Sequence, residues 1–122
     1  MSKTKILLVE DEVITASSLK MGLEAQGYFV CPLATRGDRA LEIARSEQPD
    51  VVLMDVNLPG DMNGIETARC INDEMETSIL FLTGYHDDDI IAKINALNPI
   101  GYFVKPVSAE RIKEKLDQHL SS

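Results

Sequence analysis

The stretch VVLMDVNLPGDMNG, from Val51 to Gly64, joins four apolar residues to a carboxylate and then to a turn. The apolar run is typical of a strand that is buried on both faces, and Pro59 and Gly60 interrupt regular structure soon afterwards. Asp55 therefore stands where the expected strand ends. An ionised carboxylate beside a core needs a partner, because burying an unpaired charge is costly. The stretch indicates a strand that delivers Asp55 to a polar site.

Short apolar runs of this kind recur along the whole chain. They are KILLVE (5–10), YFVCP (28–32), DVVLMD (50–55), SILFLT (78–83) and GYFVKP (101–106). Between them, apolar residues lie three or four positions apart, as in Ile90, Ile94 and Leu97, which favours helices. Strands that alternate with helices predict an α/β fold, a doubly wound five-stranded parallel sheet with five helices. The run 28–32 is the weakest and suits an edge strand.

Length, charge and cysteine content narrow the classes of function. The chain has 122 residues, which suits a single domain over 1–122. A net charge of −8 argues against direct binding of nucleic acid and against docking on an anionic membrane. No run approaches the ~20 apolar residues of a membrane span, and no signal peptide is recognisable. Cys31 and Cys70 lack metal-site spacing, so we expect reduced thiols in a cytoplasmic protein.

Chemically useful side chains follow four of the five expected strands. They are Glu10, Asp11 and Glu12 after the first strand, Asp55 after the third, Thr83 after the fourth and Lys105 after the fifth. Because the carboxyl ends of parallel strands meet at one edge of the sheet, these groups should converge there. Crowded carboxylates cannot all ionise without a cation, and Mg²⁺ prefers carboxylate and phosphoryl oxygens.

The set predicts phosphoryl transfer to a carboxylate. Asp55 is the expected nucleophile, and Asp11 and Asp55 are expected to bind the ion. Thr83 and Lys105 are expected to contact the phosphoryl group. Each residue alone also has a purely structural explanation, such as an acidic helix start or a strand-end cap. Their shared position at the strand ends favours a functional site.

The same motifs resemble the receiver domains of bacterial and archaeal two-component response regulators. The resemblance runs from KILLVEDE through PDVVLMDVNLPG, NGIETA and ILFLTGY to GYFVKPV. It implies a flavodoxin-like (βα)5 fold that accepts a phosphoryl group on an aspartate from a histidine kinase or a histidine phosphotransfer protein. It implies Mg²⁺ as the cofactor. Such a domain is a phosphoacceptor switch rather than an enzyme, since it catalyses only its own phosphorylation and dephosphorylation.

Matched residue by residue, the resemblance assigns the site. Asp55 looks like the phosphoacceptor, Glu10 and Asp11 look like the acidic pair at the metal, and the backbone carbonyl of Asn57 looks like a further metal ligand. Thr83 and Lys105 look like the residues that contact the phosphoryl group. No organic cofactor is expected.

Two further roles follow from the resemblance. Tyr102 looks like the aromatic switch residue, which turns into the space that Thr83 vacates when Thr83 moves toward the phosphoryl group. Asn57 and Tyr85, two positions past Asp55 and Thr83, are expected to set the lifetime of the phosphoryl group.

The switch is expected to alter one face, formed by a helix at about 87–97, the last strand and a last helix at 108–120. The last strand lacks the acidic pair of receivers that dimerise as winged-helix transcription factors, so their dimer interface is not carried over to this chain. A homodimer through this face stays an open alternative. Two other departures concern loops. Asp55 and Gly64 are nine steps apart where many receivers have eight, and Gly84 follows Thr83 where many have Ala.

Other classes of function remain as alternatives. A haloacid-dehalogenase-type phosphatase also uses a strand-end Asp with Mg²⁺, but it needs a second Asp where this chain has Asn57. A flavin-binding module would need a phosphate loop after the first strand, where acids stand instead. A phosphorylation-independent binding or scaffold module should lack one of the site residues, and none is missing.

Overall fold

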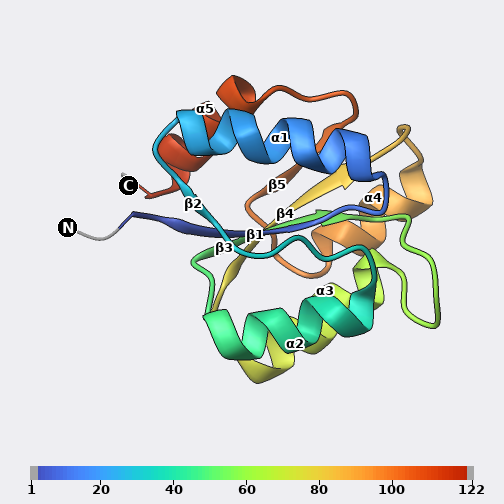
Figure 1. The fold of residues 1–122 in the computed structure, drawn as a ribbon. Helices are drawn as coiled ribbons and strands as arrows, with labels where there is room; N and C mark the ends of the chain where they lie inside the picture. The colour runs from blue at the N-terminus through green and yellow to red at the C-terminus, as the bar shows by residue number, and fades with distance from the viewer. Residues whose placement is uncertain (1–2, 121–122) are drawn as a thin grey trace.

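The structure is a computed structural model, and it describes residues 3–120. Its helices are α1 (Val13–Ala25), α2 (Gly37–Glu47), α3 (Gly64–Glu74), α4 (Asp88–Asn95) and α5 (Ala109–Leu120). Figure 1 shows α1 and α5 on one side of a central sheet and α2 and α3 on the other. The expected domain includes residues 1–2 and 121–122, which lie outside the described residues.

The five strands form one parallel sheet in the order β2-β1-β3-β4-β5. They are β1 (Lys5–Val9), β2 (Phe29–Val30), β3 (Val51–Asp55), β4 (Ser78–Thr83) and β5 (Gly101–Val104). The three apolar strands β3, β1 and β4 occupy the centre, where both faces of a sheet are covered. The sequence-based prediction of a doubly wound five-stranded parallel sheet with five helices is confirmed.

The strand at the β2 edge is shorter than the sequence suggested. The expected strand 28–32 reduces to Phe29–Val30, although the backbone N–H of Cys31 still bonds to Ile6 of β1. Pro32 has no N–H to continue the ladder. The chain touches β1 once more through a bridge between Val9 and Ala34, so the edge position of this run is confirmed.

A hydrophobic core fills each side of the sheet. Ala68 and Ile71 of α3 and Ile94 of α4 pack with Phe81 on one side. Leu23 of α1 packs with residues of α5 and of the central strands on the other. Within residues 3–120, no helix has the length and apolar character needed to cross a membrane.

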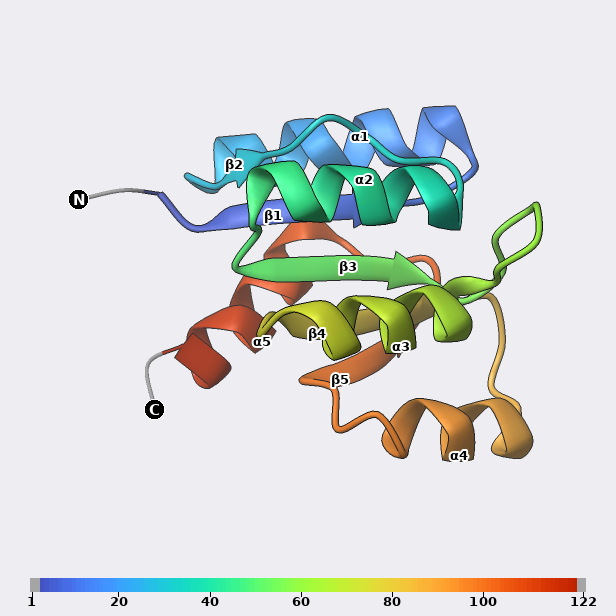
Figure 2. The same ribbon diagram turned by 90° about the horizontal axis from the view of Figure 1, so that it is seen from below.

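The loop that follows β3 projects beyond the carboxyl edge of the sheet (Figure 2) and ends in a well-defined helix start. Asn63 and Glu66 form a reciprocal capping box, as their spacing predicts. The N–H of Gly64 donates to the carbonyl of Val56 at 2.8 Å. A Cβ at Gly64 would collide with the carbonyl of Asp55. Glycine at this position therefore lets α3 begin directly against the end of β3.

Candidate functional site

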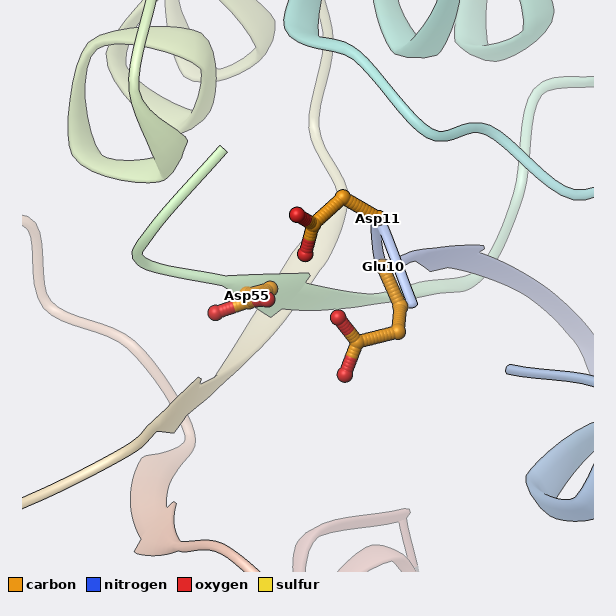
Figure 3. A group of neighbouring side chains, drawn as sticks. All are labelled: Glu10, Asp11 and Asp55. Atoms are coloured by element: carbon orange, nitrogen blue, oxygen red, sulfur yellow. The ribbon is translucent and has the colours of Figure 1, made fainter. Parts of the chain in front are cut away.

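The sheet register brings the acidic residues together. Val9 of β1 lies opposite Met54 of β3, so Glu10 and Asp55 follow as neighbours at the same edge. Figure 3 shows Glu10 and Asp11 beyond β1 and Asp55 on β3 around a common space. Ligand atoms of the three carboxylates all lie within 4.8 Å of one another. Glu10 and Asp55 are each only 1% exposed, whereas Asp11 faces solvent.

Lys105 supplies the positive charge at this cluster. It follows the last residue of β5, and its Nζ donates to Oε1 of Glu10 at 2.8 Å and to Oδ2 of Asp55 at 3.0 Å. Its side chain is 20% exposed. The ammonium therefore bridges two buried carboxylates that lie 95 and 50 positions away from it in the chain, which converts a repulsive pair into a bonded triad.

The pKa values of the three residues of this triad are shifted in different directions. Burial raises the pKa of the Asp55 carboxyl to about 7, the Glu10 carboxylate adds to the rise, and Lys105 opposes it. Burial also acts to raise the pKa of Glu10, but hydrogen bonds with Asp55, Lys105 and the N–H of Glu12 outweigh it and lower this pKa. Burial works to lower the pKa of Lys105, yet its two carboxylate partners leave it raised. Asp55 is thus the member of the triad whose pKa lies closest to neutral pH.

Backbone groups fix the orientation of the two buried carboxylates. The N–H of Asn57 donates to Oδ1 of Asp55 at 3.0 Å, and the N–H of Glu12 donates to Oε2 of Glu10 at 3.3 Å. Each carboxylate therefore keeps one oxygen on the backbone and one on Lys105. The role of Glu12 as a donor was not foreseen from the sequence, because a backbone N–H has no sequence signature.

The donor set fits a hard divalent cation. Three carboxylates from Glu10, Asp11 and Asp55 converge, and they present only oxygen ligands to the shared space. Mg²⁺ is commonly bound by one or two carboxylates with water completing its shell, and the solvent-facing Asp11 leaves one side accessible. The cluster can therefore hold a metal ion of this class.

Thr83 lies at the end of β4, as the sequence predicted, and its side chain is fully buried. Its hydroxyl donates to the carbonyl of Tyr85 at 3.1 Å. Thr83 thus lies at the same edge of the sheet as Asp55, but its hydroxyl is bonded to the loop that follows β4. Tyr85 itself is exposed, and its backbone carbonyl rather than its ring makes this contact.

Tyr102 occupies β5, one strand from Thr83, and is half-buried against the core on the α3 side. Its ring lies 6.4 Å, centroid to centroid, from the imidazole of His86. His86 also lies 3.3 Å from a carboxylate oxygen of Asp88. The His86 side chain is exposed. Its contact with Tyr102 depends on the path of the loop after β4, which no sequence motif specifies.

Residues 6–117 match the response regulator receiver domain family over most of the chain. The chain belongs to this family. It is a receiver domain of the two-component signalling type, and receiver domains work with histidine kinases or phosphotransfer partners. The resemblance inferred from the strand-end motifs is confirmed.

Relatives in several bacteria support the same assignment. This receiver domain is 31% identical over 114 residues to the transcriptional regulatory protein YdfI of Bacillus subtilis, covering 93% of this chain and 53% of that protein. It is 37% identical over 115 residues to the aerobic respiration control protein ArcA of Escherichia coli K12, covering 92% and 46%. The chain therefore spans about half the length of the curated relatives it matches.

Solved structures agree with the fold. The signal receiver domain of a modulated diguanylate cyclase from Desulfovibrio desulfuricans G20 superposes with a TM-score of 0.91 at 30% identity, covering 98% of this chain and 95% of that chain. A CheY-like response regulator receiver domain protein from Methanospirillum hungatei JF-1 superposes with a TM-score of 0.90 at 27% identity, with the same coverage. The flavodoxin-like (βα)5 arrangement is confirmed.

Proposed function

We propose that Asp55 is the phosphoacceptor of this receiver domain, within a single domain that covers 1–122. The observation that carries the proposal is the triad at the strand ends, in which Lys105 bonds to both Asp55 and Glu10. A buried carboxylate fixed by a backbone N–H on one oxygen keeps a defined direction for attack. The proposed donor is a phosphohistidine of a histidine kinase or a histidine phosphotransfer protein.

The transfer exchanges one bond to phosphorus for another. An Asp55 carboxylate oxygen forms a P–O bond while the P–N bond of the phosphohistidine breaks, and the bonding electrons leave with the imidazole. Lys105 would remain beside the new phosphoryl group and balance part of its charge. Dephosphorylation reverses the gain, because water attacks the phosphorus and the Asp55 carboxylate leaves. We propose that the domain catalyses only these two reactions of its own aspartate.

We propose Mg²⁺ as the cofactor, held by the carboxylates of Glu10, Asp11 and Asp55 and by the backbone carbonyl of Asn57. The fit rests on the converging oxygen donors of the acidic cluster. When bound, the ion supplies positive charge that offsets the phosphoryl oxygens. Lys105 supplies the remaining positive charge from the protein itself.

We propose that Thr83 and Tyr102 form the switch. Thr83 would exchange its bond to the Tyr85 carbonyl for one to the phosphoryl group, and Tyr102 would turn toward the space it leaves. The face formed by α4, β5 and α5 would change as a result. Asn57 and Tyr85 would set the lifetime of the phosphoryl group, because neither side chain readily activates water.

The output and the setting are proposals too. Docking of a partner on the α4-β5-α5 face is the output we favour, and a homodimer through that face is the alternative. We propose a cytoplasmic location, since Cys31 and Cys70 are both free thiols.

Intact mass spectrometry tests the phosphoacceptor directly. The chain is incubated with a small phosphodonor, with and without Mg²⁺, alongside Asp55→Asn and Asp61→Asn, the second being an exposed acid in the loop that follows β3. One phosphoryl group should add to the wild type and to Asp61→Asn only in the presence of Mg²⁺, and Asp55→Asn should stay unmodified. Modification of Asp55→Asn, or none of the folded wild type, would remove the proposal and favour a phosphorylation-independent scaffold.

A further inference from the structure

A groove opens between α3 and α4 beside the site but outside it. It has a volume of about 410 Å³ and is lined by Val56, Asn57, Asn63, Ile65, Glu66, Arg69, Ile90 and Lys93. The buried Val56 and Ile65 and the half-buried Ile90 provide apolar surface. Asn57 connects the rim of the groove to the loop that follows Asp55. The groove thus combines apolar surface with a polar rim, which is the character of a recognition site.

Two cationic side chains flank the groove. Arg69 of α3 and Lys93 of α4 are exposed, and neither forms an ion pair with any residue among 3–120. The chain has 20 acidic side chains against 12 basic ones. Six of those twelve do pair with acids, namely Lys5, Arg36, Arg39, Arg45, Lys105 and Lys113. Two unpaired cations on one groove therefore form a local positive site on an acidic protein.

The groove contains one carboxylate of its own, and it is already engaged. Glu66 accepts a hydrogen bond from the N–H of Asn63 at 3.0 Å as part of the capping box. That bond directs the carboxylate to the start of α3. Arg69 and Lys93 thus keep their donors available for an incoming anion.

We propose that this groove binds an acidic amphipathic segment of a partner protein. Carboxylates of the segment would pair with Arg69 and Lys93, and an apolar side chain between them would pack on Ile65 and Ile90. A nucleic acid suits the groove poorly, because the net charge of −8 repels a polyanion. A small inorganic anion would leave the apolar surface uncovered. Charge and apolar surface together select an acidic peptide.

The proposal goes beyond phosphorylation of Asp55 and does not depend on it. The groove is formed by side chains of α3, α4 and the loop after β3, so the proposed binding calls on neither a phosphoryl group nor Mg²⁺. Because Asn57 belongs both to the groove rim and to the loop after Asp55, a bound segment would touch the loop that borders the acidic cluster.

The test is an amide NMR titration of the unphosphorylated chain without Mg²⁺. The probe is a capped eight-residue peptide that alternates Asp or Glu with Leu, and the matched control peptide carries Asn and Gln in place of the acids. Shifts should appear at residues of α3, α4 and the loop after β3 with the acidic peptide only. Since exposed ion pairs contribute modestly, we expect Arg69→Gln and Lys93→Gln each to weaken binding about two- to fivefold.

Charge-matched variants separate recognition from general electrostatics. The control double variant combines Lys3→Gln with Lys20→Gln, and it removes as many positive charges as Arg69→Gln with Lys93→Gln. Lys3 and Lys20 also lack an ion pair among the described residues. The groove double variant should lose about four- to 25-fold in affinity, the product of two such losses, while the control double variant should lose less than twofold. Equal losses in the two double variants, equal binding of the neutral peptide, or no localised shifts would overturn the proposal.

Discussion

The hydroxyl of Thr83 donates to the carbonyl oxygen of Tyr85 at 3.1 Å, although Thr83 stands at the same sheet edge as Asp55. Because a hydroxyl has one hydrogen to donate, Thr83 cannot hold this bond and donate to a phosphoryl oxygen at once. Donation to a phosphoryl group would therefore release the loop between β4 and α4. Phosphorylation of Asp55 would then alter the position of this loop, in which His86, the residue after Tyr85, contacts Tyr102.

Replacing Thr83 should separate phosphorylation from the response to it. Thr83→Ala removes the donor, and a charge-assisted hydrogen bond contributes about 1.5–3 kcal/mol, so we expect phosphorylation about 10- to 100-fold slower. Amide shifts of β5 on phosphorylation should shrink as well. Thr83→Ser keeps the hydroxyl and should retain most of both. Full shifts in the alanine variant, measured at complete phosphorylation, would show that Thr83 does not couple the two sites.

Lys105 should contribute to stability as well as to chemistry. Lys105→Gln deprives two buried carboxylates of their shared donor, and we expect about 1–3 kcal/mol of lost stability in urea unfolding at pH 7.5 without Mg²⁺. The loss stays moderate because Asp55, with its raised pKa, can take up a proton. Lys113→Gln, which breaks the exposed pair with Asp117, should cost no more than about 0.5 kcal/mol. Equal costs in the two variants would contradict the triad as a stabilising unit.

Magnesium should stabilise the folded chain through the acidic cluster. At ten times its dissociation constant, an ion that binds only the native state adds about 1.4 kcal/mol. The thermal unfolding midpoint of the wild type should therefore rise with Mg²⁺, and Asp11→Asn should remove most of the rise. Asp61→Asn, an exposed acid in the loop after β3, should behave like the wild type. If the unfolding midpoint of the wild type does not change with Mg²⁺, the acidic cluster is not a metal site.

Gly64 should be intolerant of any side chain, because an added Cβ would meet the Asp55 carbonyl and lie 2.8 Å from the Cα of Val56. Since backbone rather than a flexible side chain is in the way, we expect Gly64→Ala to cost about 1–3 kcal/mol in urea unfolding. Gly84→Ala is the matched control, since nothing lies within 4 Å of its added Cβ. The idea fails if both alanine variants unfold at the same urea concentration.

Cys31 should make stability fall at high pH. Burial raises the pKa of its thiol to about 11 from an ordinary 9.0. The unfolded thiol ionises first as pH rises, so its contribution is complete below pH 9 and is lost as pH passes through about 11. Cys31→Ala should flatten this part of the stability profile relative to the wild type. In the folded chain at pH 8, a thiol reagent should label the half-buried Cys70 and spare Cys31, as peptide mapping would reveal.

Most of the fold could be predicted from the sequence, because strands that are buried on both faces have continuous apolar runs. The strand 78–83 was predicted at its observed bounds, and the helix expected at about 87–97 appears as Asp88–Asn95. The prediction for 28–32 was too long. An edge strand is buried on fewer sides, so its apolar pattern says little about where pairing stops.

The residues of the candidate site could be predicted from the sequence to a similar extent. Glu10, Asp11, Asp55, Thr83 and Lys105 could be named together, because parallel strands bring their carboxyl ends to one edge whatever the details of packing. The hydrogen-bond partners of these side chains could not be predicted. Lys105 bonds to Glu10, 95 positions away, and the Thr83 hydroxyl bonds to the carbonyl of Tyr85. Both bonds depend on side-chain rotamers, which are set by neighbours in space.

The sequence by itself determined the alternation of strands and helices and the residues at the strand ends, since both follow from which positions are apolar. Only the tertiary structure decided the bonds among those residues, the close approach of Gly64 to Asp55, and the groove between α3 and α4 with Arg69 and Lys93 on its rim. The physical reason is that periodicity records burial, a property of single positions, whereas hydrogen bonds, contacts and cavities are properties of pairs and groups that only the folded chain brings together.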